Sequence, residues 1–144
     1  MAIGLASGKI LIYDVREMKV AQELEPPQNG SEINKLVFSN KGVYLAATWK
    51  TLGICRVFSL HKECAYADLD HKDNMVTSVA FDKFGGYLMT AAGNELSIFN
   101  YKNWKKPVGL FQLGTPIQSA MFDMTCNKIF VGCATVGAIK MLSL

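Results

Sequence analysis

The chain has 144 residues, a formal net charge of +3 and a hydrophobic content of 50%. A chain of this length can bury a substantial core, and its apolar content argues against a disordered protein. The sequence holds no apolar run of about 18 residues and no charged-then-apolar leader, so a membrane span is excluded and a cytosolic or nuclear location is expected.

Short runs rich in β-branched and aromatic residues, separated by turns that contain Gly or Asn, predict consecutive antiparallel hairpins along the chain. Pro26 and Pro27 begin a loop that extends to Gly30, because a residue without an N–H group cannot continue a ladder. In chain order, strands are expected at residues 1–6, 9–15, 20–24, 33–39, 43–48, 54–60, 65–69, 76–81, 87–92, 96–101, 108–113, 117–122, around 129, and at 138–144.

The predicted strands fall into units that repeat about every 41–45 residues, and four short strands in such a period are typical of a WD-type β-propeller blade. The first strands align on Phe38, Phe81 and Phe122. The third strands align on Tyr13, Phe58, Phe99 and Leu142. Helical repeats of similar length would need apolar residues at i, i+3 and i+4, a pattern that these runs lack.

The chain is therefore predicted to be all-β, a single domain of residues 1–144 that forms the C-terminal part of a WD-repeat β-propeller. It would contain about three and a half four-stranded blades, at approximately residues 1–24, 33–70, 76–113 and 117–144. Propellers close with roughly four to eight blades, so that no sheet keeps an uncovered face. We therefore expect the rest of the ring to lie N-terminal to Met1.

Two strings within these units carry a more specific likeness, FDKFGGYL at residues 81–88 and FSNKGVYLA at residues 38–46. A Lys-x-Trp pair, Lys102 and Trp104, follows the first of them. With these motifs the chain resembles, over essentially its whole length, the C-terminal WD-repeat domain of the pre-mRNA-processing factor 19 family. Members of that family are splicing-associated U-box ubiquitin ligases.

The resemblance implies a seven-bladed ring that docks partner or substrate proteins. The parent protein would carry ubiquitin-ligase activity in a U-box and form a homotetramer through a coiled coil, both outside these residues. The implied partners are spliceosome-associated proteins of the Nineteen complex or ubiquitylation substrates. The implied location is the nucleus, with the cytosol as the alternative, and some family members also act in DNA repair. Two other functions stay open: a generic WD-repeat adaptor unrelated to splicing, and a propeller that binds RNA or phosphopeptides.

No catalytic, cofactor or metal site is expected within the chain. The four cysteines form no Cys-x-x-Cys pair, and the two histidines, His61 and His71, are not at metal-ligand spacing. No nucleophile–base pair and no Gly-rich phosphate loop stands out. The lysines are spread thinly over the turns, with one small cluster around Trp104, so direct nucleic-acid binding is disfavoured.

The loops are the expected binding surface, because the strands are needed for the sheets. Trp49 and Lys50 occupy a turn that should open on the same rim as the loops before each first strand, and an aromatic residue beside a lysine is typical of a binding hot spot. The other interpretation is that Trp49 covers the blade edge, and for His71 a structural role is favoured. The candidate partner-binding residues are Trp49, Lys50, Asn29, His71, Lys72, Asp73 and Thr115, with Lys102, Trp104 and Lys105 as the alternative rim.

Aromatic residues also recur at equivalent positions of the units, and we expect their rings to pack in the core. For Trp104, a packing role for the ring is favoured over a binding role, with solvated lysines around it. The recurring aromatic residues are Phe38, Phe81, Phe99, Phe122, Tyr44 and Tyr87.

Overall fold

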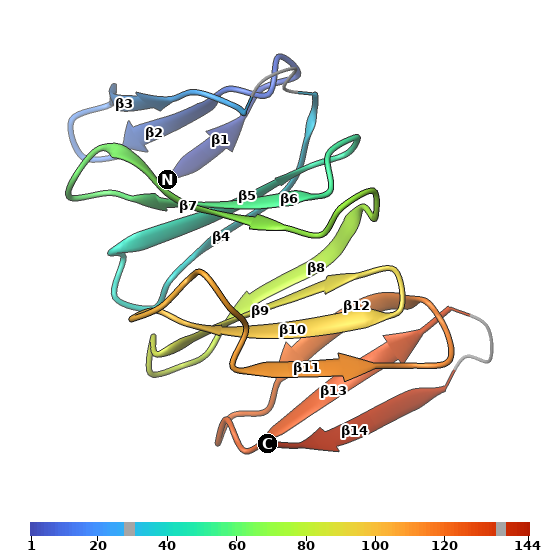
Figure 1. The fold of residues 1–144 in the computed structure, drawn as a ribbon. Helices are drawn as coiled ribbons and strands as arrows, with labels where there is room; N and C mark the ends of the chain where they lie inside the picture. The colour runs from blue at the N-terminus through green and yellow to red at the C-terminus, as the bar shows by residue number, and fades with distance from the viewer. Residues whose placement is uncertain (28–30, 135–137) are drawn as a thin grey trace.

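The computed structural model describes residues 1–27, 31–134 and 138–144. In that part of the chain the regular secondary structure consists of β-strands alone (Figure 1). The described residues therefore hold no helix that could cross a membrane. The strands are β1 (Ala2–Gly4), β2 (Ile10–Asp14), β3 (Lys19–Leu24), β4 (Ile33–Phe38), β5 (Tyr44–Trp49), β6 (Ile54–Ser59), β7 (Cys64–Asp70), β8 (Val76–Phe81), β9 (Tyr87–Ala92), β10 (Glu95–Asn100), β11 (Gly109–Gln112), β12 (Ile117–Phe122), β13 (Lys128–Cys133) and β14 (Ile139–Ser143).

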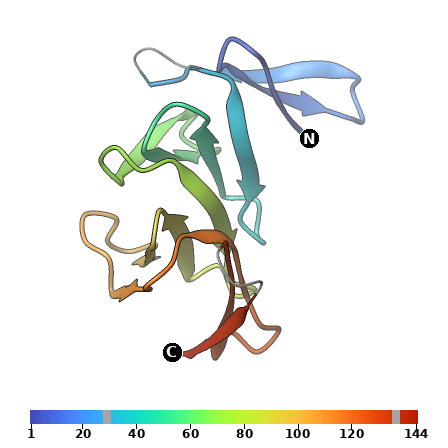
Figure 2. The same cartoon turned by 90° about the vertical axis from the view of Figure 1, so that its right-hand side faces the viewer.

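The described strands form four antiparallel sheets, and within each sheet the strands follow one another in chain order. The sheets are β1-β2-β3, β4-β5-β6-β7, β8-β9-β10-β11 and β12-β13-β14. The all-β prediction and the grouping into units of three or four strands are confirmed. The sheets stack in sequence from the N-terminus to the C-terminus, and the described residues do not close them into a ring (Figures 1 and 2).

The turn between the first and second strands of a unit is stabilised by the same device three times. A side-chain oxygen directly after the first strand accepts a hydrogen bond from the backbone N–H that opens the second strand. The distances are 3.0 Å for Ser39 with Tyr44, 2.7 Å for Asp82 with Tyr87 and 2.9 Å for Asp123 with Lys128. In the first two turns a glycine takes the left-handed conformation that the reversal requires, with φ of 66° at Gly42 and 73° at Gly85.

The first strands β4, β8 and β12 lie next to one another along one side of the stack (Figure 2). Each carries a β-bulge at its second residue, where the pairing register shifts. A bulged residue is unpaired in its own sheet, and here its side chain reaches the next sheet. Asn34 Nδ2 donates to the Val76 carbonyl at 2.8 Å, and Thr77 Oγ1 donates to the Ile117 carbonyl at 2.8 Å.

The core consists of three apolar clusters, one between each pair of consecutive sheets. Second and third strands of the inner sheets are buried on both faces, which explains why β5 and β9 are almost continuously apolar. The first cluster includes Ile10, Leu45, Trp49 and Phe58; the second Cys55, Val57, Leu88, Phe99 and Trp104; the third Leu96, Ile98, Ile129 and Val131.

The far face of the last sheet has no neighbour among the described residues. Ala46 and Met89 are buried, whereas Phe130 at the equivalent position is 37% exposed. Ile98 is buried, whereas its equivalent Met141 is 55% exposed. Each of the two inner sheets therefore packs one face against the preceding sheet and the other face against the following one, whereas the last sheet packs on one face only among the described residues.

The recurring aromatic residues are not all in the core. Phe99 is buried, but Phe38 is 40% exposed and Tyr87 is 43% exposed, so the core prediction is wrong for these two. Phe38 ends the first strand at the sheet margin, where it lines a shallow groove beside Lys83. Tyr87 lines a cavity, whereas Tyr44 at the equivalent position is covered by Trp104. The remaining members, Phe81, Phe122 and Tyr44, are half-buried.

Candidate functional site

One edge of the stack is formed by the loops that precede the first strands and by the turns between second and third strands. We call this edge the loop rim; it comprises residues 31–32, 50–53, 71–75, 93–94 and 113–116 and lies on the right-hand side of Figure 1. Lys50 joins the β5–β6 turn to the loop before β4. Its backbone N–H donates to the Glu32 carbonyl at 3.0 Å, and its ammonium pairs with the Glu32 carboxylate at 2.7 Å.

The rest of the loop rim is held together by backbone contacts between successive loops. The His71 N–H donates to the Gly53 carbonyl at 2.7 Å, and the Ile117 N–H donates to the Gly93 carbonyl at 2.7 Å. A Cβ atom on Gly53 would lie only 1.9 Å from the Lys72 carbonyl oxygen, so only glycine permits this approach. The expectation that these loops share one rim is therefore confirmed.

The structure places most of the predicted binding residues on the loop rim, with different exposure. Lys50, Lys72 and Asp73 are exposed, and Thr115 is half-buried. Asn29 lies outside the described residues. Binding of a partner by these residues stays a prediction.

Trp49 is the correction on this rim. Its side chain is fully buried between the first and second sheets, where it packs with Ile10 and Phe58. The indole Nε1 donates to the Gly8 carbonyl at 3.0 Å. The expectation of an exposed Trp49 ring is wrong, because the side chain of this last residue of β5 points into the interface between the sheets. The other interpretation, that Trp49 covers the blade edge, is closer to the observed packing.

His71 lies at the start of the loop before β8 and is 7% exposed. Among the described residues, its Nε2 atom has no hydrogen-bond partner. Burial lowers the pKa of His71, and the nearby carboxylates of Glu95 and Asp70 oppose this effect only in part. A buried imidazole of this kind fits the structural role, since a binding partner does not reach it without a rearrangement.

The alternative rim is the opposite edge of the stack. Lys102 and Lys105 are exposed there, but the Trp104 ring between them is 8% exposed and belongs to the second apolar cluster. Its ring centroid lies 5.8 Å from that of Tyr44 in an edge-on arrangement. The packing role expected for Trp104 is confirmed, and this rim presents its lysines without that aromatic ring.

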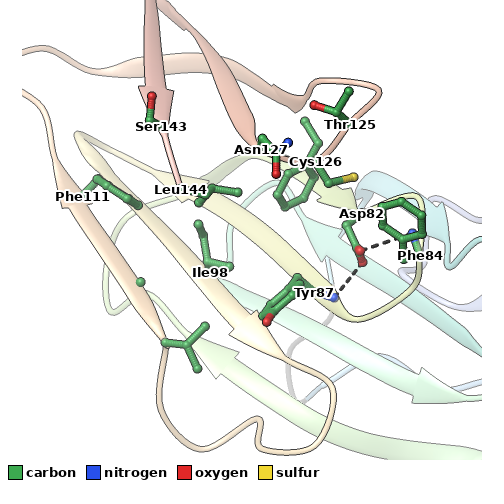
Figure 3. A pocket seen from close by; sticks show the side chains of 13 residues that line it. Asp82, Phe84, Tyr87, Ile98, Phe111, Thr125, Cys126, Asn127, Ser143 and Leu144 are labelled. Atoms are coloured by element: carbon green, nitrogen blue, oxygen red, sulfur yellow. Dashed lines mark hydrogen bonds between the residues drawn. The ribbon is translucent and has the colours of Figure 1, made fainter.

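A cavity with a volume of about 540 Å³ lies at this opposite edge, between the third and fourth sheets (Figure 3). We call it the Tyr87 cavity. Its walls come from the β8–β9 turn and the start of β9, from β10 and β11, from the end of β12 and the β12–β13 turn, and from the end of β14. They include Tyr87, Ile98, Phe111, Phe122, Cys126 and Leu144.

Chemically the Tyr87 cavity is apolar with one buried carboxylate. Asp82 is 3% exposed and accepts hydrogen bonds from the N–H groups of Tyr87 at 2.7 Å and Phe84 at 3.2 Å (dashed lines in Figure 3). Because both of its oxygens hold the turn, Asp82 is a structural residue. The cavity suits an apolar side chain, and sequence reasoning did not predict it. The signal in the sequence was that Tyr44 and Tyr87 stand at equivalent positions, whereas the connection after a third strand carries a tryptophan, Trp104, in one unit alone.

The cysteines and acidic residues show no metal centre in the part of the chain that the structure describes, where no three metal-ligating side chains come together. Burial raises the pKa of the Cys55 thiol, so it stays protonated and packs as a small apolar group. The Asp68 carboxylate is occupied by Arg56, which donates two hydrogen bonds at 2.6 and 2.7 Å. No protein-family model and no curated protein matches this sequence.

Proposed function

We propose that the chain is part of a WD-type β-propeller and serves as a protein-docking scaffold. The observation that carries this proposal is the repeated sheet. Units of the same strand order stack through the same columns of residues, and the loops described between and within these units gather on one rim. Rigid sheets that present a row of loops are a common architecture for binding other proteins.

The family that we propose is that of the splicing-associated U-box ubiquitin ligases, on the strength of the motifs at residues 38–46 and 81–88. The partners would then be spliceosome-associated proteins of the Nineteen complex or ubiquitylation substrates, met in the nucleus. The exposed residues Lys50, Lys72 and Asp73 supply the charged part of a docking surface on the loop rim.

Binding of RNA or phosphopeptides is the weaker alternative. The small cluster of Lys102, Lys105 and Lys106 is exposed, but the Trp104 ring among them is buried against Tyr44. A buried ring offers no face on which a base can stack. Binding to phosphate groups alone would weaken steeply as the salt concentration rises, which separates the two functions in a titration.

The test is affinity capture from nuclear extract with the chain as bait, scored on named spliceosome-associated proteins. We expect the charge-reversal pair Lys50→Glu and Lys72→Glu on the loop rim to lose these proteins. The matched pair Lys102→Glu and Lys105→Glu on the opposite rim should retain them. Urea unfolding of each variant shows whether a loss comes from unfolding.

Two results would contradict the proposal. In the first, spliceosome-associated proteins are captured no better by the wild-type chain than by an unrelated β-protein. In the second, the control pair loses the partners while the loop-rim pair retains them, which would move the docking surface to the opposite edge.

A further inference from the structure

A groove with a volume of about 320 Å³ runs along the margin between the second and third sheets, the two inner sheets of the stack. Its walls come from the end of β7, from β10 and β11, and from the connection between these last two strands (Figure 1). One end opens on the loop rim, where the loop before β8 begins. We call it the Glu95 groove, and its lining includes Asp70, His71, Glu95, Trp104, Lys105 and Leu110.

The end of the groove at the loop rim carries two carboxylates that no cation neutralises. Asp70 and Glu95 form no ion pair in the part of the chain that the structure describes. Asp70 Oδ1 accepts the Lys72 N–H at 2.7 Å, and Glu95 Oε1 accepts the Ser97 hydroxyl at 3.3 Å, which leaves the second oxygen of each carboxylate for a ligand. The adjacent His71 does not supply the missing charge, because burial lowers the pKa of its imidazole.

Two buried side chains of the groove also lack a partner. His71 is 7% exposed and Trp104 is 8% exposed, and both line the groove. Among the described residues, neither His71 Nε2 nor Trp104 Nε1 has a hydrogen-bond partner. An indole N–H can only donate, whereas the unprotonated nitrogen of a neutral imidazole accepts. Because an unsatisfied buried polar atom costs free energy, the groove favours a ligand that brings both a donor and an acceptor.

The preceding sheet indicates which side chain is missing. Ser97 pairs with Leu110 across β10 and β11 at the position where Arg56 pairs with Asp68 across β6 and β7. The Arg56 guanidinium donates two hydrogen bonds to the Asp68 carboxylate, at 2.6 and 2.7 Å. In the third sheet the long cationic side chain is replaced by the short Ser97, while a carboxylate, Glu95, lies beside it. The third sheet therefore keeps an acceptor for a guanidinium but has no arginine of its own there.

We propose that the Glu95 groove binds an arginine side chain of a partner protein that docks on the loop rim. The guanidinium pairs with the carboxylates of Glu95 and Asp70, since its planar fork of donors matches carboxylate oxygens. Its aliphatic part lies against Leu110, which is 54% exposed. As the side chains rearrange around the ligand, a guanidinium N–H reaches His71 Nε2, and a backbone carbonyl of the partner accepts the Trp104 indole N–H. The inference rests on the proposed docking function only in that the arginine belongs to a protein.

The experiment titrates N-acetyl-arginine amide into the isotope-labelled full chain at neutral pH and follows the two indole N–H signals by NMR. The Trp104 signal should shift and saturate. The Trp49 signal should stay in place, because that indole is already bound to the Gly8 carbonyl. A Trp104→Phe variant assigns the two signals. N-acetyl-citrulline amide, which has nearly the same shape without the charge, should produce no saturable shift, because it cannot form the ion pairs.

Two carboxylate variants form a matched pair. Glu95→Gln should weaken the arginine amide at least about tenfold, since it removes a charge-assisted hydrogen bond. Glu32→Gln, which changes a carboxylate of the loop rim outside the groove, should leave the affinity within about twofold. Both substitutions keep the shape of the side chain, and the NMR spectrum of each variant shows whether it is folded.

The docking proposal and the groove can fail separately. The variant with Lys50→Glu and Lys72→Glu should bind the arginine amide no more weakly than the wild-type chain does, even though it should lose the captured proteins. Loss of the captured proteins alone therefore concerns the loop rim, and loss of the arginine amide alone concerns the groove.

Any of four results overturns the proposal. The first is a Trp104 signal that does not shift saturably with the arginine amide. The second is equal binding of the citrulline amide. The third is a Glu95→Gln variant that binds as tightly as Glu32→Gln. The fourth is an equal shift of both indole signals, which would show that the arginine amide acts on the whole chain and not at the groove.

Discussion

Trp49 offers the sharpest test of the structure, because sequence reasoning and the structure place its ring in opposite environments. We consider Trp49→Ala. Removal of a fully buried tryptophan side chain typically costs about 3–5 kcal/mol of unfolding free energy. It also leaves the Gly8 carbonyl without the indole donor, at a cost of about 1 kcal/mol.

The assay is equilibrium unfolding in urea, followed by circular dichroism. With a loss of about 4 kcal/mol and an m-value of about 2 kcal/mol/M, the midpoint should fall by about 2 M. The midpoint of Trp49→Phe should lie between those of the wild-type chain and Trp49→Ala, because phenylalanine keeps most of the apolar volume but loses the hydrogen bond. Lys50→Glu is the neighbouring control, and its exposed pair with Glu32 should change stability by less than about 1 kcal/mol.

The reasoning is refuted if Trp49→Ala and Lys50→Glu have the same midpoint. An unchanged midpoint combined with a loss of partner binding would mean that the Trp49 ring is exposed at the rim after all. A change in m rather than in the midpoint would indicate that the substitution alters the compactness of the unfolded or native state, and the comparison would then need a thermal measurement.

Gly53→Ala should destabilise the chain by at least about 1–3 kcal/mol, since its Cβ would lie 1.9 Å from a backbone carbonyl, whereas Gly114→Ala, with no atom within 4 Å, should be neutral by urea midpoint. Asn34→Ala should cost about 1–2 kcal/mol through its lost bond to the next sheet; the equivalent Gln118→Ala, exposed on the last sheet, should cost nothing measurable, and equal effects would contradict the bridging role. Because burial lowers the pKa of His71, the unfolded state takes up the proton first, so stability should fall as the pH drops below about 6.5. His71→Gln should flatten the urea midpoint between pH 7.5 and 5.5, and an unchanged slope would show that His71 is protonated freely in the native state.

The strands and their grouping could be predicted because both depend on local patterns. The segments expected at residues 76–81, 87–92 and 117–122 coincide with β8, β9 and β12, since alternating side chains and turn residues act over only a few positions. The common rim of the loops could be predicted from the same repeat, because the chain passes from each sheet to the next on the same side of the stack.

The exposure of individual aromatic residues could not be predicted, because it depends on what the neighbouring sheet contributes. Trp49 looks like a turn residue by its place beside Lys50, yet the Gly8 carbonyl of the preceding sheet accepts its N–H. Tyr44 and Tyr87 occupy equivalent positions, but only Tyr44 is covered by Trp104. A repeat alignment treats these positions as equal and cannot show that one of them opens on a cavity.

The bulged first strands have a consequence for how such a chain could lengthen in evolution. Asn34 and Thr77 each give a hydrogen bond to the same backbone carbonyl position of the following sheet, although the two side chains differ. The acceptor is a main-chain atom, which every duplicated unit carries whatever its sequence. An internal duplication would therefore always bring the acceptor with it, and the residue at the bulge could diverge afterwards among side chains that carry a hydrogen-bond donor without losing the junction.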